Sequence, residues 1–356
     1  MKNFYVQQNE AGQRLDKLLA KLLNKAPKSF LYKMLRKKNI VLNGKKAEGS
    51  EKLALDDRIT LFLSDETIAE FSEQAEAVVV KKDLDIVYED PHLLVVNKPI
   101  GELSQKAEKE DVSMVEYIIS YLLTSRQLTR EQLTSFKPGI CNRLDRNTSG
   151  LLIAGKSLPG LQEMAEILKN RSLGKYYLCI VKGRLEGNKR VEGYLSKDEA
   201  TNKVKIHSVQ IEDAEYICTE YEPICSLPGK EVGSKNASER RQTQEAMVQN
   251  NLRGITEEGA KGAFTLLQVK LITGRSHQIR AHLASLGHPL IGDYKYGDQK
   301  TNHYFKSRYG LTHQLLHSYR MVFPELKGEL SYLSGKELKA EQPEIFLKIQ
   351  KDLFMQ

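Results

Sequence analysis

The pattern of apolar and polar positions over residues 1–66 predicts a small unit of two helices and a hairpin. Leucines recur at helical spacing over residues 15–23, ahead of Pro27, and Leu31 and Leu35 stand four apart in a second candidate helix. The apolar triplet at residues 40–42 leads into Asn43-Gly44, a pair typical of tight hairpin turns because both residues tolerate positive φ. A further strand is predicted over residues 59–63.

The pattern after residue 66 predicts a linker and then a second folded unit. Residues 67–81 hold three glutamates and no basic residue before Lys81, which favours a linker. Residues 84–88 and 93–96 flank an Asp90-Pro91 turn and predict a β-hairpin at the start of a unit over residues 82–356. Within that unit, the polar, glycine-rich residues 229–262 predict a long exposed loop.

Composition narrows the class of protein. Hydrophobic residues make up 40% of the chain and charged residues 28%, as in a globular protein. No apolar run approaches the roughly 18 residues that a membrane span needs. The N-terminus has no apolar core followed by a small-residue cleavage site. We therefore expect a cytoplasmic protein without a membrane partner.

Cysteines and histidines give no sign of a disulfide framework or a metal site. The four cysteines are scattered without a C-x-x-C pair, and we expect reduced thiols. His277, His282 and His288 lie close together in sequence, but their spacing is not that of a zinc motif and no cysteine or carboxylate completes a set. No metal is expected.

The net charge of +8 and the pI near 9.0 favour a polyanionic partner. Residues 1–66 hold 14 Lys and Arg against 8 Asp and Glu, so most of the excess is at the N-terminus. Between residues 28 and 46 no residue is acidic and seven are basic: Lys28, Lys33, Arg36, Lys37, Lys38, Lys45 and Lys46. The charges alone suit a solvated helix face equally well. Their position on a helix and a hairpin favours contacts with RNA phosphates.

This arrangement resembles the S4 RNA-binding domain. The resemblance rests on Q-R-L-D-K-L-L at residues 13–19 and N-I-V-L-N-G-K-K at residues 39–46. It implies that the basic side chains of the second helix and the hairpin bind RNA.

Two later segments carry candidate chemistry. Asp145 stands between Arg143 and Arg146, just before an apolar strand over residues 151–154. A carboxylate between arginines is more often a surface ion pair than a catalytic group. In the second segment, T-G-R-S-H-Q-I-R-A-H-L at residues 273–283, Ser276 is expected to cap a short helix. Arg280 follows next to the buried face of that helix, and the pattern alone favours a purely structural role for it.

Together these segments resemble the RluA-type pseudouridine synthases. Four motifs of that family stand in order: Lys-Pro-x-Gly at residues 98–101, R-L-D-R-x-T-S-G at 143–150, Lys-x-Tyr-Leu at 175–178 and T-G-R-x-H-Q-I-R at 273–280. Asn142 replaces the usual histidine, and residues 101–105 lack the common Val-His-Pro. Lys98 is expected to shape the hairpin near the site rather than to perform chemistry.

The resemblance implies a role for each matching residue. Asp145 becomes the catalytic carboxylate, acting either as a nucleophile or as a base that abstracts a proton. Arg280 pairs with it and favours its charged form. Tyr177 packs on the target base, whereas strand alternation points Tyr176 to the other face. Arg143 either fills the space that a flipped uridine leaves or holds the displaced backbone.

The resemblance also implies an α+β fold with a mixed, largely antiparallel sheet and an enzyme that isomerises uridine in structured RNA without metal or organic cofactor. The expected partner is 23S ribosomal RNA or its precursor particle, bound by a monomer. Two alternatives remain: a tRNA substrate, or a non-catalytic RNA-binding protein of ribosome assembly. The combination of Asp145, Tyr177 and Arg280 argues against the second, since a pure binder needs no carboxylate beside an anionic ligand.

Overall fold

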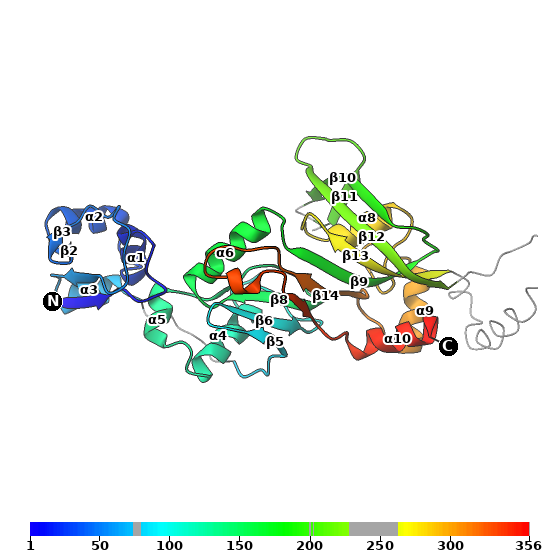
Figure 1. Cartoon of the computed structure of the whole chain (residues 1–356), viewed down its shortest axis with the longest axis horizontal. Helices are drawn as coiled ribbons and strands as arrows, with labels where there is room; N and C mark the ends of the chain where they lie inside the picture. The colour runs from blue at the N-terminus through cyan, green and yellow to red at the C-terminus, as the bar shows by residue number, and fades with distance from the viewer. Residues whose placement is uncertain (74–79, 199–200, 202, 228–262, 356) are drawn as a thin grey trace, which may run out of the picture.

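A computed structural model of the chain describes residues 1–73, 80–198, 201, 203–227 and 263–355 (Figure 1). The N-terminal unit, at the left of Figure 1, has a four-stranded sheet in the order β1-β4-β2-β3. Its elements are β1 Lys2–Tyr5, α1 Leu15–Leu22, α2 Lys28–Arg36, β2 Ile40–Leu42, β3 Lys45–Lys46, β4 Arg58–Leu61 and α3 Asp65–Phe71.

The core of the N-terminal unit follows the predicted periodicity. The helical leucines of α1 are all buried and pack against the apolar face of α2 and against Ile40. Asn43 and Gly44 have φ of 51° and 76°, the left-handed values that a two-residue hairpin turn requires. Both helices and the hairpin expected from the sequence are therefore confirmed.

Residues 67–71, which the sequence assigned to a linker, belong to α3. Ser64 caps this helix by accepting a hydrogen bond from the Thr67 N–H at 3.2 Å. Ile68 is buried in the N-terminal core, and the ring of Phe71 lies 4.4 Å from that of Phe30, centroid to centroid. The unit therefore extends past the predicted boundary at residue 66.

The N-terminal unit is in direct contact with the rest of the chain. The Ser135 hydroxyl, at the end of helix α5 (Arg130–Ser135), donates to the carboxylate of Glu10. The backbone N–H of Leu158 donates to the Asn9 side-chain oxygen at 3.2 Å. Figure 1 shows α5 beside α1 at this junction.

The second unit is built on an eleven-stranded sheet with helices packed around it. The main path of strands is β11-β10-β12-β13-β9-β14-β8-β6-β5, all antiparallel except for the parallel pair β14 and β8. This confirms the expected α+β fold with a mixed, largely antiparallel sheet. Its elements, besides α5, are β5 Ile86–Glu89, β6 Leu93–Lys98, α4 Met114–Thr124, β7 Gly139–Ile140, β8 Ser149–Gly155, α6 Leu158–Lys169, β9 Gly174–Lys182, β10 Lys189–Asp198, β11 Lys203–His207, β12 Glu215–Leu227, β13 Phe264–Leu271, α8 Gln278–Ser285, α9 Gln299–Tyr309, β14 Leu316–Val322, η2 Ser331–Leu333, β15 Glu337–Lys339 and α10 Glu344–Phe354.

Strands β6 and β8 each have four consecutive apolar residues, 93–96 and 151–154, because both faces of the sheet are covered there. Leu93 and Ile153 face a core that includes Met164 of α6, whereas Leu94 and Leu152 face α4. The predicted hairpin of β5 and β6 is confirmed. The loop predicted over residues 229–262 lies outside the described residues.

Gly150 lets β8 meet β14 in register. Its φ is +110°, and a Cβ atom there would lie 2.2 Å from the backbone oxygen of Ser318. Only glycine permits this approach. The contact fixes the start of β8, and with it the loop of residues 141–148 that carries Asp145.

None of the helices in the described ranges is long and apolar enough to cross a membrane.

Candidate active site

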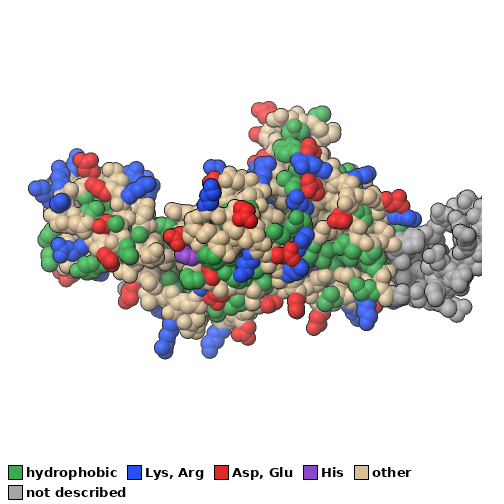
Figure 2. Space-filling model, viewed as in Figure 1, with side chains coloured by type: hydrophobic (Ala, Val, Ile, Leu, Met, Phe, Trp, Pro, Cys, Tyr) green, Lys and Arg blue, Asp and Glu red, His purple; other side chains and the backbone are tan. Residues whose placement is uncertain are grey.

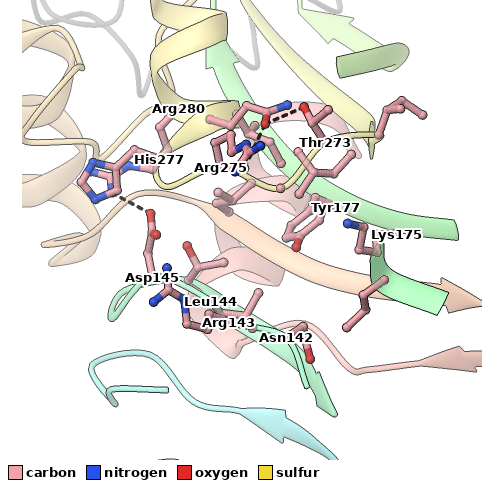
Figure 3. Close-up of a pocket in the computed structure, with 18 of the residues that line it drawn as sticks. Asn142, Arg143, Leu144, Asp145, Lys175, Tyr177, Thr273, Arg275, His277 and Arg280 are labelled. Carbon is pink, nitrogen blue, oxygen red and sulfur yellow. Dashed lines mark hydrogen bonds and ion pairs between the residues drawn. The ribbon is translucent and has the colours of Figure 1, made fainter. Parts of the chain in front are cut away.

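Several motifs singled out in the sequence converge on one cleft of about 570 Å³ (Figure 3). Asp145 and Arg143 enter it from the loop before β8, Tyr177 from β9, and Arg280 from α8. The four side chains that the resemblance assigned to the site thus line the same cavity. The seven basic residues between positions 28 and 46 lie elsewhere, on the N-terminal unit.

Lys98 holds the loop that carries Asp145 in place by a hydrogen bond to its backbone. Its side chain is fully buried, and its ammonium group donates to the backbone oxygens of Pro99 and Glu102 at 2.8 Å and of Arg146 at 3.0 Å. Burial lowers the pKa of Lys98 to about 8, although the charges of Glu102 and Asp145 oppose the shift. With its three donors occupied, Lys98 joins the Lys-Pro-x-Gly element to the loop that carries Asp145, which agrees with the expected structural role.

Ser104 forms a second clamp on the same loop, and sequence reasoning missed it. Its hydroxyl donates to the Leu144 backbone oxygen at 2.8 Å and accepts from the Leu144 N–H at 3.0 Å. The next residue is Asp145, whose backbone oxygen accepts from the Thr148 N–H at 3.0 Å. Ser104 stands where this chain departs from the family's Val-His-Pro, so nothing in the sequence pattern indicated its contact with Leu144.

Replacing Ser104 with alanine is expected to lower the free energy of unfolding by about 1–3 kcal/mol, because a buried N–H and a buried C=O of Leu144 both lose their partner. Urea denaturation would measure the change. Ser29→Ala, at an exposed position on α2, is the matched control and should stay within about 0.5 kcal/mol of the unchanged protein. Equal midpoints for the two variants would show that the clamp does not stabilise the loop.

Arg280 is shared between two carboxylates. Its Nη1 donates to Asp145 Oδ2 at 2.8 Å, while Nε and Nη2 form a bidentate pair with Asp293 at 2.7 and 3.0 Å. Asp293 is fully buried and also accepts from the backbone N–H groups of Lys295 and Tyr296. Asp293 therefore positions the guanidinium, and the guanidinium in turn positions the Asp145 carboxylate.

The charges of this buried pair are mutually stabilised. Burial on its own would lower the pKa of Arg280, but the hydrogen bonds and charge of Asp293, together with Asp145, raise it. Burial would raise the pKa of Asp293, yet its bonds to Arg280 hold that pKa below the ordinary range. Both side chains remain charged at neutral pH. Asp145, which is partly exposed, presents its carboxylate to the cleft.

The turn before α8 is held by Gln278 rather than by the expected serine cap. The cap position is His277, in the left-handed conformation with φ of 54°, so the prediction for Ser276 is wrong. The Gln278 Oε1 accepts from the Thr273 hydroxyl at 2.8 Å and from the Arg275 N–H at 3.1 Å. These bonds make the T-G-R-x-H-Q segment a compact turn from which Arg280 reaches Asp145.

Tyr177 presents an aromatic side chain to the cleft. It is buried on β9, and burial raises its pKa to about 12, so the phenol is neutral at pH 7. Tyr176 points to the opposite face, as strand alternation predicts, where the Arg320 guanidinium lies 3.9 Å from its ring centroid. Asn142, the departure from the family's histidine, bonds the backbone of β8.

The walls of the cleft are strongly cationic. Among the described residues that line it, Asp145 is the one carboxylate, and the Lys and Arg side chains are Arg143, Lys169, Arg171, Lys175, Arg275 and Arg280. Such a lining suits a polyanionic ligand. A single oriented carboxylate beside an aromatic ring can act on a flat, uncharged base carried by that ligand, either by attack or by proton transfer.

Comparison with known proteins gives a consistent picture. Residues 92–285 match the family model described as RNA pseudouridylate synthase. The chain is 28% identical over 326 residues to an uncharacterized RNA pseudouridine synthase of Mycoplasma genitalium, a match that covers 91% of this chain and 90% of the relative. It is also 28% identical over 323 residues to the ribosomal large subunit pseudouridine synthase C of Escherichia coli strain K12, covering 88% and 86%. Human RNA pseudouridylate synthase domain containing 4 shares its fold, with a TM-score of 0.53 and 18% identity over 75% of this chain and 92% of that one.

Proposed function

The chain belongs to the RNA pseudouridylate synthase family and is an isomerase acting on RNA, and from this premise we propose that Asp145 is its catalytic carboxylate and 23S ribosomal RNA its substrate. One observation carries the assignment of Asp145: its carboxylate, held by Arg280 at 2.8 Å, shares a cation-lined cleft with the ring of Tyr177.

The reaction needs no redox step and no outside group. The bond from ribose C1′ to uracil N1 breaks, the base rotates, and C1′ bonds to C5, while C5 loses a proton and N1 gains one. Asp145 either attacks the sugar or base to stabilise the detached state or accepts the proton that the rearrangement releases. A carboxylate serves both routes, and the bond from Arg280 aims it into the cleft.

The remaining residues of the site bind and expose the base. A uridine in folded RNA must leave its stack, which costs a few kcal/mol, before an enzyme reaches its glycosidic bond. The aromatic face of Tyr177 offers a replacement stacking surface. Arg143 is exposed at the rim of the cleft and occupies the space that the flipped uridine vacates.

The substrate assignment rests on the relatives and on the N-terminal unit. Relatives that match most of this chain are named for the large ribosomal subunit. Figure 2 shows Lys and Arg side chains gathered on the N-terminal unit, the part that carries α2 and β3 in Figure 1. This S4-like unit binds RNA alongside the catalytic unit, through the basic residues of α2, of the turn that ends it and of the β2–β3 hairpin: Lys28, Lys33, Arg36, Lys37, Lys38, Lys45 and Lys46.

The proposed function is tested by incubating the purified protein with total RNA from cells that lack its gene and locating each new pseudouridine. New pseudouridine in 23S ribosomal RNA is the expected result. New sites confined to transfer RNA would overturn the substrate, and none in any RNA would reject the proposed function.

The Lys33→Gln, Arg36→Gln, Lys37→Gln triple variant tests the basic surface of α2. All three side chains are exposed, and no described carboxylate forms an ion pair with them. Each lost phosphate contact should lower the slope of log affinity against log salt by about 0.7 to 0.9, so a decrease of about 2 to 3 is expected. Deleting residues 1–66 is a poorer test because it would cut inside α3 and remove the core against which Ile68 packs.

The control for this variant is Lys348→Gln, which removes an exposed charge on α10, at the far end of the molecule in Figure 1. Equal salt slopes for the triple variant and the control would mean that α2 faces away from bound RNA.

A further inference from the structure

Lys175 is a nearly buried cation with no partner in the described part of the chain. It lies on β9, its side chain lines the cleft (Figure 3), and only 9% of it is exposed. No described residue forms a hydrogen bond or ion pair with its ammonium group. Burial lowers its pKa, and the neighbouring charge of Arg171 lowers it further. A poorly solvated ammonium without a partner is unfavourable in the free protein, and an anion bound in the cleft would supply the missing partner.

The end of α6 brings two further cations to the same wall. Lys169 and Arg171 are exposed, line the cleft, and have no ion pair among the described residues. Arg171 has φ of 57°, the left-handed conformation that usually falls to glycine at a helix end. A non-glycine residue in this conformation is strained, and such strain is typical of functional positions.

The order of residues along β9 relates this wall to the site of chemistry. Lys175 and Tyr177 are two residues apart on one strand, so their side chains point to the same face about 6.5 Å from each other. On the other side, the Lys175 ammonium approaches Gly274 of the turn before α8. When a base stacks on Tyr177, the sugar-phosphate backbone of that nucleotide therefore lies within reach of Lys175.

We propose that Lys175, Lys169 and Arg171 form a phosphate-binding subsite that grips an RNA phosphodiester beside the uridine held in the cleft. This subsite rests on the proposed function, and it identifies the part of the RNA that these three residues bind: a backbone phosphate. Three cations without a carboxylate match a phosphodiester better than the neutral carbonyl oxygens of uracil, which need one donor each.

Lys175→Met tests the subsite, because methionine keeps the length of the side chain and removes its charge. The probe is a short RNA fragment that contains the uridine located in total RNA. The Kd of Lys175→Met is expected to rise about tenfold, and the salt slope to fall by about 0.7 to 0.9. Lys175→Arg keeps the charge and should retain the slope. Lys348→Met, on α10, is the control for removal of an exposed lysine.

Thermal unfolding without RNA supplies a second readout. Since Lys175 is an unpaired buried charge, Lys175→Met should melt at the same temperature as the unchanged protein or higher. If Lys175 served the fold alone, Lys175→Met would melt at a lower temperature than the unchanged protein. Weaker binding together with unimpaired stability supports the subsite.

Two negative results are distinguishable. If the unchanged protein converts the fragment and Lys175→Met keeps the same Kd and salt slope, the phosphate subsite is overturned and the proposed function stands. If the unchanged protein makes no new pseudouridine in total RNA, the proposed function fails and the subsite, which rests on it, fails with it.

Discussion

Asp145→Asn is expected to reduce pseudouridine formation on the order of a thousandfold or more in single-turnover assays, while the protein stays folded. The substitution preserves size but removes the one carboxylate among the described lining residues of the cleft. An amide neither attacks carbon nor accepts a proton at neutral pH. Because Asp145 is partly exposed and its loop is held through backbone groups, the fold should change little.

RNA binding is the control for this variant. Losing a carboxylate beside an anionic ligand should leave the Kd unchanged or lower it. Activity within a few-fold of the unchanged protein would exclude Asp145 as the catalytic group, and a large loss of affinity would mean that the substitution disrupts the cleft.

Arg280→Leu is the second change with a large expected effect, and it should act on turnover and stability together. The Asp145 carboxylate loses its orienting partner, so the single-turnover rate at saturating RNA falls while the Kd changes less. Asp293 is left charged in a fully buried position, so the free energy of unfolding should drop by about 3–5 kcal/mol. Denaturant unfolding and single-turnover kinetics measure the two effects.

The double variant Arg280→Leu, Asp293→Asn separates the effect on turnover from the effect on stability. Removing the stranded charge should recover most of the lost stability without recovering activity, because Asp145 still has no partner. Recovery of both would mean that Arg280 acts through the fold alone. A raised Kd with a flatter salt dependence and a normal single-turnover rate would instead make Arg280 a phosphate contact.

Local patterns predicted the elements whose stabilising contacts are local. The leucine spacing of α1 and the Asn43-Gly44 turn each specify a structure within a few residues, and both are as predicted. Helix α3 was missed because its acidic composition suggested a linker. Its signals were the Ser64 cap and the pair Ile68 and Phe71, whose burial depends on a core formed by residues far earlier in the chain.

Contacts in the candidate site were harder to predict because they join distant segments. The pairing of Arg280 with Asp145 spans 135 positions, and the family resemblance rather than periodicity suggested it. Asp293 lies in the tail of the last motif, but only the folded chain shows that it holds Arg280. Ser104 bonds Leu144 across 40 positions in a segment that lacks the family pattern. The cap predicted at Ser276 failed because Gln278 supplies the turn's acceptor from within the helix.

The central claim is that this chain makes pseudouridine through Asp145. It is tested most directly by locating pseudouridine in total RNA from three strains: one that carries the gene, one that lacks it, and one that carries Asp145→Asn at a matched protein level. We expect defined sites in 23S ribosomal RNA to be modified in the first strain and unmodified in the other two. Pseudouridine retained at those sites in the Asp145→Asn strain would contradict the account.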